Sequence, residues 1–201
     1  MVSNEHINVI KRNGRGPETL DIDKIHSMVG FATEGITGVS ASHVEMNSGL
    51  QFFDGISTED IQQILIKSAN DLISLESPNY QYVAARLLLF SLRKSLHHRL
   101  WEHPKFITHI KKLVDLGLYD KGILDNYTEA EIDRMGMWID HERDYSFTYA
   151  GLRQVMDKYL VQDRSTGEIF ETPQFMYMMI SATLFACLLY TSPSPRDLQG
   201  S

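Results

Sequence analysis

The chain has 201 residues, and its 26 acidic side chains outnumber the 19 basic ones, which gives a net charge of −7. This length allows one domain of ordinary size or two small ones, each with its own core. The acidic balance argues against generic nucleic-acid binding, which needs a basic field to neutralise phosphates. The single cysteine, Cys187, excludes a disulfide framework and a cysteine-based zinc site, and is typical of a reducing cytosol.

The N-terminal segment predicts a small β-hairpin followed by a helix. Ile7–Ile10 is a short run rich in β-branched residues, and Asn13–Pro17 concentrates turn-forming residues. Asp21 can then cap a helix that Gly35 ends. The apolar residues of this helix recur at helical spacing: Ile22, Ile25, Val29 and Ala32. A second, weaker helix is expected to start at Ser40.

Two further helices are expected before residue 103. Ser57 with Asp60 resembles a capping box, and an apolar face follows it: Ile61, Ile64, Leu65, Ala69 and Leu72. Pro78 separates this helix from a longer one over residues 79–100, whose inward face is Tyr82, Val83, Leu87, Leu89 and Phe90. The sequence therefore predicts four helices beneath a hairpin.

Beyond residue 103 the helical pattern continues in shorter segments. We expect helices over 106–116, 128–138 and 148–159, and a β-hairpin around Asp163–Gly167. Phe175–Tyr190 carries no charge, but its 16 residues fall short of the roughly 20 that a bilayer requires, so a buried core helix is expected. The last ten residues have the composition of a linker or fusion scar.

Basic residues are spread over the first hundred positions. Lys11-Arg12 alone is typical of a hairpin turn with solvated charges, and Arg93-Lys94 of a helix C-terminus, where cations meet the negative end of the dipole. Lys24 is harder to explain, because a cation in a first helical turn is disfavoured unless an anion lies nearby. Brought together by the fold, these residues would form one anion pocket.

Other motifs favour ordinary structural roles. The histidines at 97, 98, 103 and 109 match no compact ligand spacing, so we expect surface or packing roles and no metal site. His141-Glu142 begins like a zincin helix, but Tyr145 stands where the second ligand would be. The sequence has no Walker A motif, no dinucleotide fingerprint and no nucleophilic constellation, and we predict no catalytic residue.

Several segments, in the same order, resemble the large subunit of class I ribonucleotide reductase, with bacterial and phage aerobic enzymes the most similar. Four of them resemble its ATP-cone: Val9–Gly14, Asp23–Ile25, Gly55–Ile61 and Tyr80–Leu87. Four more resemble the helical N-terminal part of its catalytic region: His141–Asp144, Phe147–Tyr149, Lys158–Val161 and Thr166–Phe175. The resemblance covers residues 6 to 186.

The resemblance implies a mainly α fold with small β-hairpins, of the α+β class. Residues 1–103 would form the ATP-cone, in which a hairpin caps a four-helix bundle. Residues 104–186 would form the helical N-terminal region, which stops before the family's ten-stranded barrel. Residues 187–201 would be a tail outside the family, produced by truncation or a shifted reading frame. Truncation would leave the apolar helix without its packing partners, which predicts self-association or poor solubility.

The resemblance also implies an allosteric site for ATP or dATP, bound with Mg²⁺. Carried over by position, the site comprises Lys11 and Arg12 beside the triphosphate, Lys24 and Lys94 as further phosphate contacts, Glu18 and Asp21 near the adenine, Thr58 near the phosphates or ribose, and Gln62 where bacterial reductases often have His. Asp21 in place of Asn is a second departure from the family, and one extra residue lies near Arg15-Gly16. Three lysines and an arginine can neutralise a triphosphate, whose charge is about −4, through charge-assisted contacts.

The implied partners are a small radical-generating subunit and a second large subunit, with neither nucleic acid nor membrane, in the cytoplasm. Ribonucleotide reduction in the family requires several cysteines, and the chain has only Cys187. We therefore expect the chain to be inactive alone and to keep only the regulatory site.

Two other functions fit parts of the pattern. A stand-alone ATP-cone regulator of reductase genes would pair the cone with a Cys-rich zinc ribbon, which one cysteine cannot build. A structural helical module without ligand would leave the basic residues as dispersed surface charges. Charge reversal at Lys24 discriminates, because it should abolish nucleotide binding only where an anion pocket exists.

Overall fold

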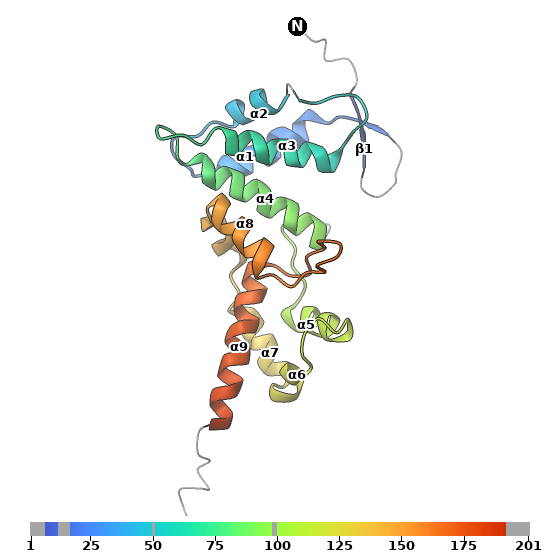
Figure 1. The fold of residues 1–201 in the computed structure, drawn as a ribbon, viewed down its shortest axis with the longest axis vertical. Helices are drawn as coiled ribbons and strands as arrows, with labels where there is room; N and C mark the ends of the chain where they lie inside the picture. The colour runs from blue at the N-terminus through green and yellow to red at the C-terminus, as the bar shows by residue number, and fades with distance from the viewer. Residues whose placement is uncertain (1–6, 12–16, 50, 98–99, 192–201) are drawn as a thin grey trace, which may run out of the picture. The chain divides into compact units, whose positions relative to one another are not determined.

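A computed structural model of the chain describes residues 7–11, 17–49, 51–97 and 100–191. These residues are mainly helical with one small sheet (Figure 1), which confirms the predicted fold class. The chain divides into two compact units, each described by itself. The first unit comprises Met1–Leu92 and Tyr145–Gln154, and the second comprises Arg93–Asp144 and Val155–Ser201.

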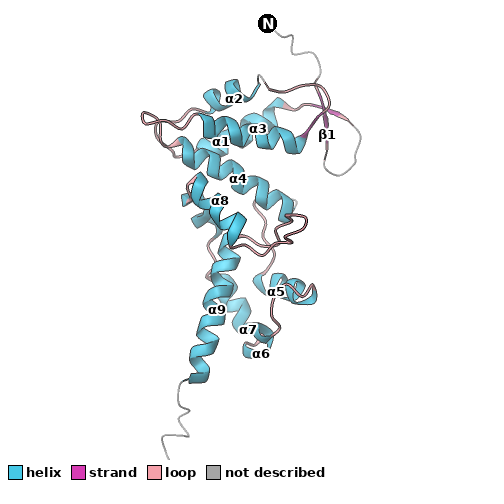
Figure 2. Cartoon of the chain, in the orientation of Figure 1, coloured by secondary structure: helices cyan, strands magenta, loops and turns pink. Residues whose placement is uncertain are grey.

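The sheet of the first unit has three short strands in the order β2-β1-β3 (Figure 2). Strands β1 (Asn8–Ile10) and β2 (Glu18–Thr19) pair antiparallel, which confirms the predicted hairpin; its turn lies outside the described residues. Strand β3 (Ile56–Ser57) pairs with β1 in parallel. We did not predict β3, because two residues carry no alternating pattern.

The described residues between 22 and 97 form four helices: α1 (Ile22–Thr33), α2 (Ala41–Gly49), α3 (Thr58–Asp71) and α4 (Tyr80–His97). Both predicted caps are confirmed: Asp21 accepts from the Lys24 N–H at 3.3 Å, and Ser57 accepts from the Asp60 N–H at 2.9 Å. The predicted apolar faces supply much of the core, including the fully buried Val29, Ala32, Leu65, Ala69, Val83, Leu87 and Leu89. Val44 of α2 is fully buried as well.

Arg86 of α4 stabilises the end of α1. Its Nη1 donates to the carbonyl of Glu34 at 2.6 Å and to that of Ala32 at 3.4 Å, so it satisfies carbonyls left open at the helix end. Its guanidinium carbon lies 5.6 Å from the ring centroid of Tyr145, in cation–π geometry. Tyr145 precedes α8 (Tyr149–Lys158), whose first part therefore belongs to the first unit.

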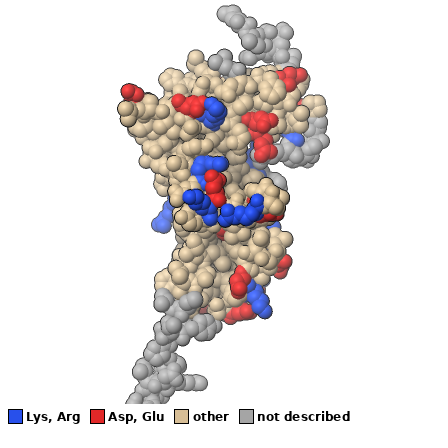
Figure 3. All heavy atoms as spheres, in the orientation of Figure 1, with Lys and Arg blue, Asp and Glu red and all other residues tan. Residues whose placement is uncertain are grey.

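Charged side chains do not segregate on the surface that Figure 3 shows. Acidic and basic atoms lie next to one another there, and most of the surface belongs to other residues. Such a mixed face supplies no extended basic field, in agreement with the net charge of −7.

The second unit contains α5 (Phe106–Asp115), α6 (Gly122–Asn126), α7 (Glu129–Met137), part of a 3-10 helix (His141–Ser146) and α9 (Pro173–Thr191). The predicted capping box of Thr128 and Glu131 is complete. The β-hairpin predicted around Asp163–Gly167 is present only as one antiparallel bridge, between Gln162 and Ile169.

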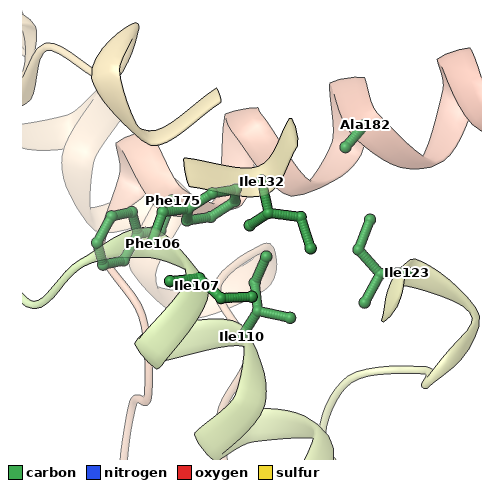
Figure 4. Close-up of a cluster of buried hydrophobic side chains, with 7 residues drawn as sticks. All are labelled: Phe106, Ile107, Ile110, Ile123, Ile132, Phe175 and Ala182. Carbon is green, nitrogen blue, oxygen red and sulfur yellow. The ribbon is translucent and has the colours of Figure 1, made fainter. Parts of the chain in front are cut away.

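Helices α5, α6, α7 and α9 share one apolar core (Figure 4): Phe106, Ile107, Ile110, Ile123, Ile132, Phe175 and Ala182. The opposite side of α9 is exposed, since Tyr177, Ile180, Leu184 and Phe185 keep 43%, 48%, 62% and 63% of their surface. The expected core helix is therefore buried on one face only, and its other face is exposed, as expected for an apolar helix that lacks packing partners. None of the described helices is long and apolar enough to cross a membrane.

Candidate anion-binding site

The parallel pairing of β1 with β3 brings two predicted site residues to one edge of the sheet. Ile10 lies opposite Ser57. Lys11 follows β1 directly and Thr58 follows β3 directly, so both come after the same end of the paired strands. Thr58 also opens α3, which places the first N–H groups and the positive end of the helix dipole at this edge. The arrangement suits an anion.

Both lysines of the first unit that we predicted to bind phosphate have carboxylate neighbours. Lys11 Nζ lies 2.5 Å from Glu18 Oε2, and Lys24 Nζ lies 2.9 Å from Asp21 Oδ2. The Lys24 ammonium lowers the pKa of Asp21, and the Asp21 carboxylate raises the pKa of Lys24. All four side chains are partly or largely exposed, and exposed pairs are weak, so a polyphosphate can replace the carboxylates as partner.

Two of the remaining predicted residues, Gln62 and Lys94, differ in burial and in the unit to which they belong. Gln62 is only 4% exposed, and its Nε2 donates to the Leu87 carbonyl of α4 at 3.0 Å. Its amide is thus tied into the helical bundle one turn after Thr58. Lys94 is an exposed residue of the last turn of α4, and it falls in the second unit. Arg12 lies outside the described residues.

Sequence reasoning missed the residues that hold β3 against β1. Asp54 Oδ1 accepts from the backbone N–H of Asn8 at 2.7 Å and from its Nδ2 at 3.1 Å. The Gly55 N–H donates to the Asn8 carbonyl at 2.8 Å, and Gly55 has a φ of 83°. The pair Asp54-Gly55 is a turn signal, and it was the available clue that a strand follows.

The histidines of the second unit pack against one another. The rings of His103 and His141 stack with centroids 3.6 Å apart, and the ring of His97 meets His103 edge-on at 5.3 Å. Burial lowers the pKa of His103 and of His109 to about 3 and that of His141 to about 4, so these three rings are neutral at physiological pH. Within the described part of the chain, no group of three or more His, Cys, Asp or Glu residues could hold a metal ion.

Two family models match the chain. Residues 7–95 match the ATP cone domain, and residues 145–193 match the all-alpha domain of ribonucleotide reductase. The chain is also 47% identical over 183 residues to ribonucleoside-diphosphate reductase 1 subunit alpha of Escherichia coli, which covers 91% of this chain and 24% of that protein. The chain therefore combines an ATP cone domain with the all-alpha N-terminal domain of ribonucleotide reductase.

Other members of this reductase family are similarly close. The alpha subunit of Haemophilus influenzae is 48% identical over 91% of the chain, and that of phage T4 is 45% identical over 89%. The resemblance to bacterial and phage reductases is thus confirmed. The chain spans about a quarter of the length of these curated relatives. All eight predicted site residues fall inside the ATP-cone match, and an ATP cone implies nucleotide binding.

Proposed function

We propose that this chain is the regulatory part of a ribonucleoside-diphosphate reductase and binds ATP or dATP as the overall-activity effector. The observation that supports it most is the parallel pairing of Ile10 with Ser57, the residues that immediately precede Lys11 and Thr58, within the ATP-cone match. In this proposal the triphosphate is contacted by Lys11, Arg12, Lys24 and Lys94, the adenine lies near Glu18 and Asp21, and Thr58 lies near the phosphates or ribose. Gln62 is also part of the site, at the position where bacterial reductases often have His. Residues 1–103 form the effector domain and residues 104–186 belong to the all-alpha region. The tail that we expect outside the family, 187–201, overlaps the all-alpha match, which runs to residue 193.

Binding exchanges one set of charge partners for another. The triphosphate takes the place of Glu18 beside Lys11 and of Asp21 beside Lys24, and its oxygens make charge-assisted contacts. Mg²⁺ is held chiefly by the phosphate oxygens and by water, as it usually is in nucleotide sites. ATP and dATP differ only in the 2′-hydroxyl, so discrimination between them acts through this group, as an allosteric coupling free energy of roughly 1–3 kcal/mol.

We further propose that the whole protein reduces ribonucleotides to deoxyribonucleotides in the cytoplasm, together with a small radical-generating subunit and a second large subunit. The 201-residue chain has one cysteine, so we propose that it does not perform this reduction by itself. Robust turnover of CDP by the purified chain would contradict this.

Calorimetric titration of the chain with ATP, dATP and GTP tests the effector site. We expect micromolar binding of the adenine nucleotides and none of GTP. Lys24→Glu should abolish binding while leaving α1 stable, because an acidic residue in a first helical turn is favourable. A dATP preference would indicate that Gln62 is tolerated where relatives have His.

The matched control is Lys67→Glu, which reverses another exposed lysine of the first unit. Lys67 pairs with Asp71 along α3 and is not among the predicted site residues. We expect Lys67→Glu to bind ATP as the unaltered chain does. If Lys24→Glu also bound normally, the basic residues would be dispersed surface charges of a structural module.

A further inference from the structure

A cavity of about 410 Å³ lies within the second unit, and none of the eight predicted effector residues lines it. It is enclosed by the last turn of α4, residues 102–104, one face of α5 and residues 168–170 beside the Gln162–Ile169 bridge. Cavities for small organic ligands measure roughly 300–1,000 Å³, so this one is large enough to hold such a ligand.

Two side chains of opposite charge line the cavity without pairing. Lys112 comes from α5, and Glu168 comes from the segment beside the bridge. Among the described residues, neither has an ion-pair partner, and they do not pair with each other. By contrast, the neighbouring Lys111 pairs with Glu129 at 2.6 Å outside the cavity. The cavity therefore offers a ligand one ammonium and one carboxylate on separate elements.

The rest of the charged lining favours a cationic group over a phosphate. Glu102 also lines the cavity, so its carboxylates outnumber its single lysine. Ser95 and His97 of the lining belong to the last turn of α4, where the negative end of the helix dipole stabilises a cation. A polyphosphate would meet repulsion from both carboxylates, so the cavity does not suit the nucleotide effector.

His109 adds a buried imidazole of defined tautomer to the lining. It is 4% exposed, and its Nε2 lies 3.4 Å from Tyr119 Oη. Because Tyr119 Oη donates its own proton to Glu171, Nε2 must be the donor to Tyr119. Burial lowers the pKa of His109 to about 3, so the ring is neutral and its Nδ1 carries a lone pair. A lone pair suits an ammonium donor and not a carboxylate.

The remaining walls are apolar and include Leu96, Pro104, Ile169 and Phe170. We propose that this cavity binds a zwitterionic α-amino acid with an apolar side chain. Glu168 contacts the ammonium of the ligand, Lys112 contacts its carboxylate, and the apolar walls cover its side chain. The proposal does not depend on the effector function, since the two sites share no residue.

Three small molecules of similar shape test the need for both charges. L-phenylalanine has an ammonium and a carboxylate, phenethylamine lacks the carboxylate, and 3-phenylpropanoate lacks the ammonium. In titrations of the full chain followed by nuclear magnetic resonance, we expect phenylalanine to bind and each analogue to bind about tenfold more weakly, because each loses one charge-assisted contact. Equal binding of phenylalanine and either analogue would overturn the proposal.

Two variants assign the charges to their partners. Lys112→Met keeps an unbranched side chain but removes the ammonium, so phenylalanine and phenethylamine should bind it about equally. Glu168→Gln should likewise bind phenylalanine and 3-phenylpropanoate about equally. The controls Lys111→Met and Glu129→Gln remove exposed charges outside the cavity and should keep both tenfold preferences. A full preference for phenylalanine over phenethylamine in Lys112→Met would contradict the assignment.

The ring nitrogens of His109 report where the ligand binds. We expect added phenylalanine to shift the Nδ1 signal of His109 in the unaltered chain, and a signal that does not move would overturn the proposal. ATP should bind Lys112→Met as it binds the unaltered chain. Failure of ATP to bind the unaltered chain would contradict the proposed effector function and leave the amino-acid site standing.

Discussion

Two buried charged side chains of the second unit, Arg93 and Asp144, are joined by an ion pair and further hydrogen bonds. Arg93 is 2% exposed, and its Nη2 donates to the His141 carbonyl at 2.5 Å and lies 3.4 Å from Asp144 Oδ2. Asp144 is 1% exposed and accepts from Gln174 Nε2 at 2.9 Å. Burial raises the pKa of Asp144, while Gln174 and the Arg93 guanidinium act in the opposite direction. The carboxylate is therefore held in place by its partners.

Replacing Asp144 by Ala should cost the chain about 3–5 kcal/mol of unfolding free energy, because it breaks a buried ion pair with Arg93 and removes the acceptor of Gln174. Urea denaturation followed by circular dichroism measures the loss. Asp140→Ala is the matched control, since Asp140 pairs with the exposed Arg143 at 3.8 Å and its removal should cost less than about 1 kcal/mol. Equal losses in the two variants would contradict a special role for the buried pair.

The histidines of the second unit make stability depend on pH. His103, His109 and His141 have pKa values of about 3, 3 and 4 in the folded chain, against about 6.5 in an unfolded one. Below pH 6.5 the unfolded state therefore binds more protons, and the free energy of unfolding falls as the pH drops. Burial raises the pKa of the Asp144 and Glu171 carboxyls, so the folded state also takes up protons as the pH falls. This uptake opposes the loss of unfolding free energy, and it is largest at the pH values where carboxyl groups usually titrate.

We expect the thermal unfolding midpoint to fall between pH 7 and pH 5. His103→Phe keeps an aromatic ring against His141 but removes one titrating group, so it should reduce the slope of the midpoint against pH. Differential scanning calorimetry at several pH values measures this slope. A slope unchanged by the substitution would show that His103 does not titrate on unfolding.

Among the secondary-structure elements, long periodic segments could be predicted from sequence and short ones could not. Helix α3 was predicted from its apolar spacing and from its N-cap Ser57, and the start of α1 was predicted from its N-cap Asp21. Strand β3 and α6 have two and five residues, too few to establish a period, and they form because neighbouring elements hold them. The proximity of Lys11 and Thr58 depends on β3, so the site's geometry could not be derived from motifs alone. The burial of Gln62 likewise depends on the approach of α4.

Gly55 controls the turn into β3. Its φ of 83° is in the left-handed region, so Gly55→Ala should destabilise the first unit by about 1–2 kcal/mol. Gly30→Ala, in the middle of α1 with no positive φ, should instead stabilise the chain by about 0.5–1 kcal/mol. Thermal denaturation compares the two. If Gly55→Ala left the unfolding free energy unchanged, the turn would adjust to the alanine without strain.

At the scale of the whole molecule, the exposed side of α9 should make the chain self-associate. Tyr177, Ile180 and Leu184 recur at helical spacing and form an apolar stripe. We expect the weight-average mass in sedimentation equilibrium to rise with concentration. The double variant Ile180→Lys with Leu184→Glu should remain monomeric, whereas Leu75→Glu, at a residue 97% exposed in the first unit, should not change the association. Unchanged association in the double variant would exclude α9 as the contact.

Helix α4 belongs to both compact units, because the division falls between Leu92 and Arg93 while the helix continues to His97. Each helical N–H donates four residues back, so the bonds of residues 93–96 reach across this division. Because the two units share helix α4, a graft that exchanges the first unit at this division must join two proteins within a helical turn and not in a loop. The helical phase at the junction, and not only its sequence, must then be preserved.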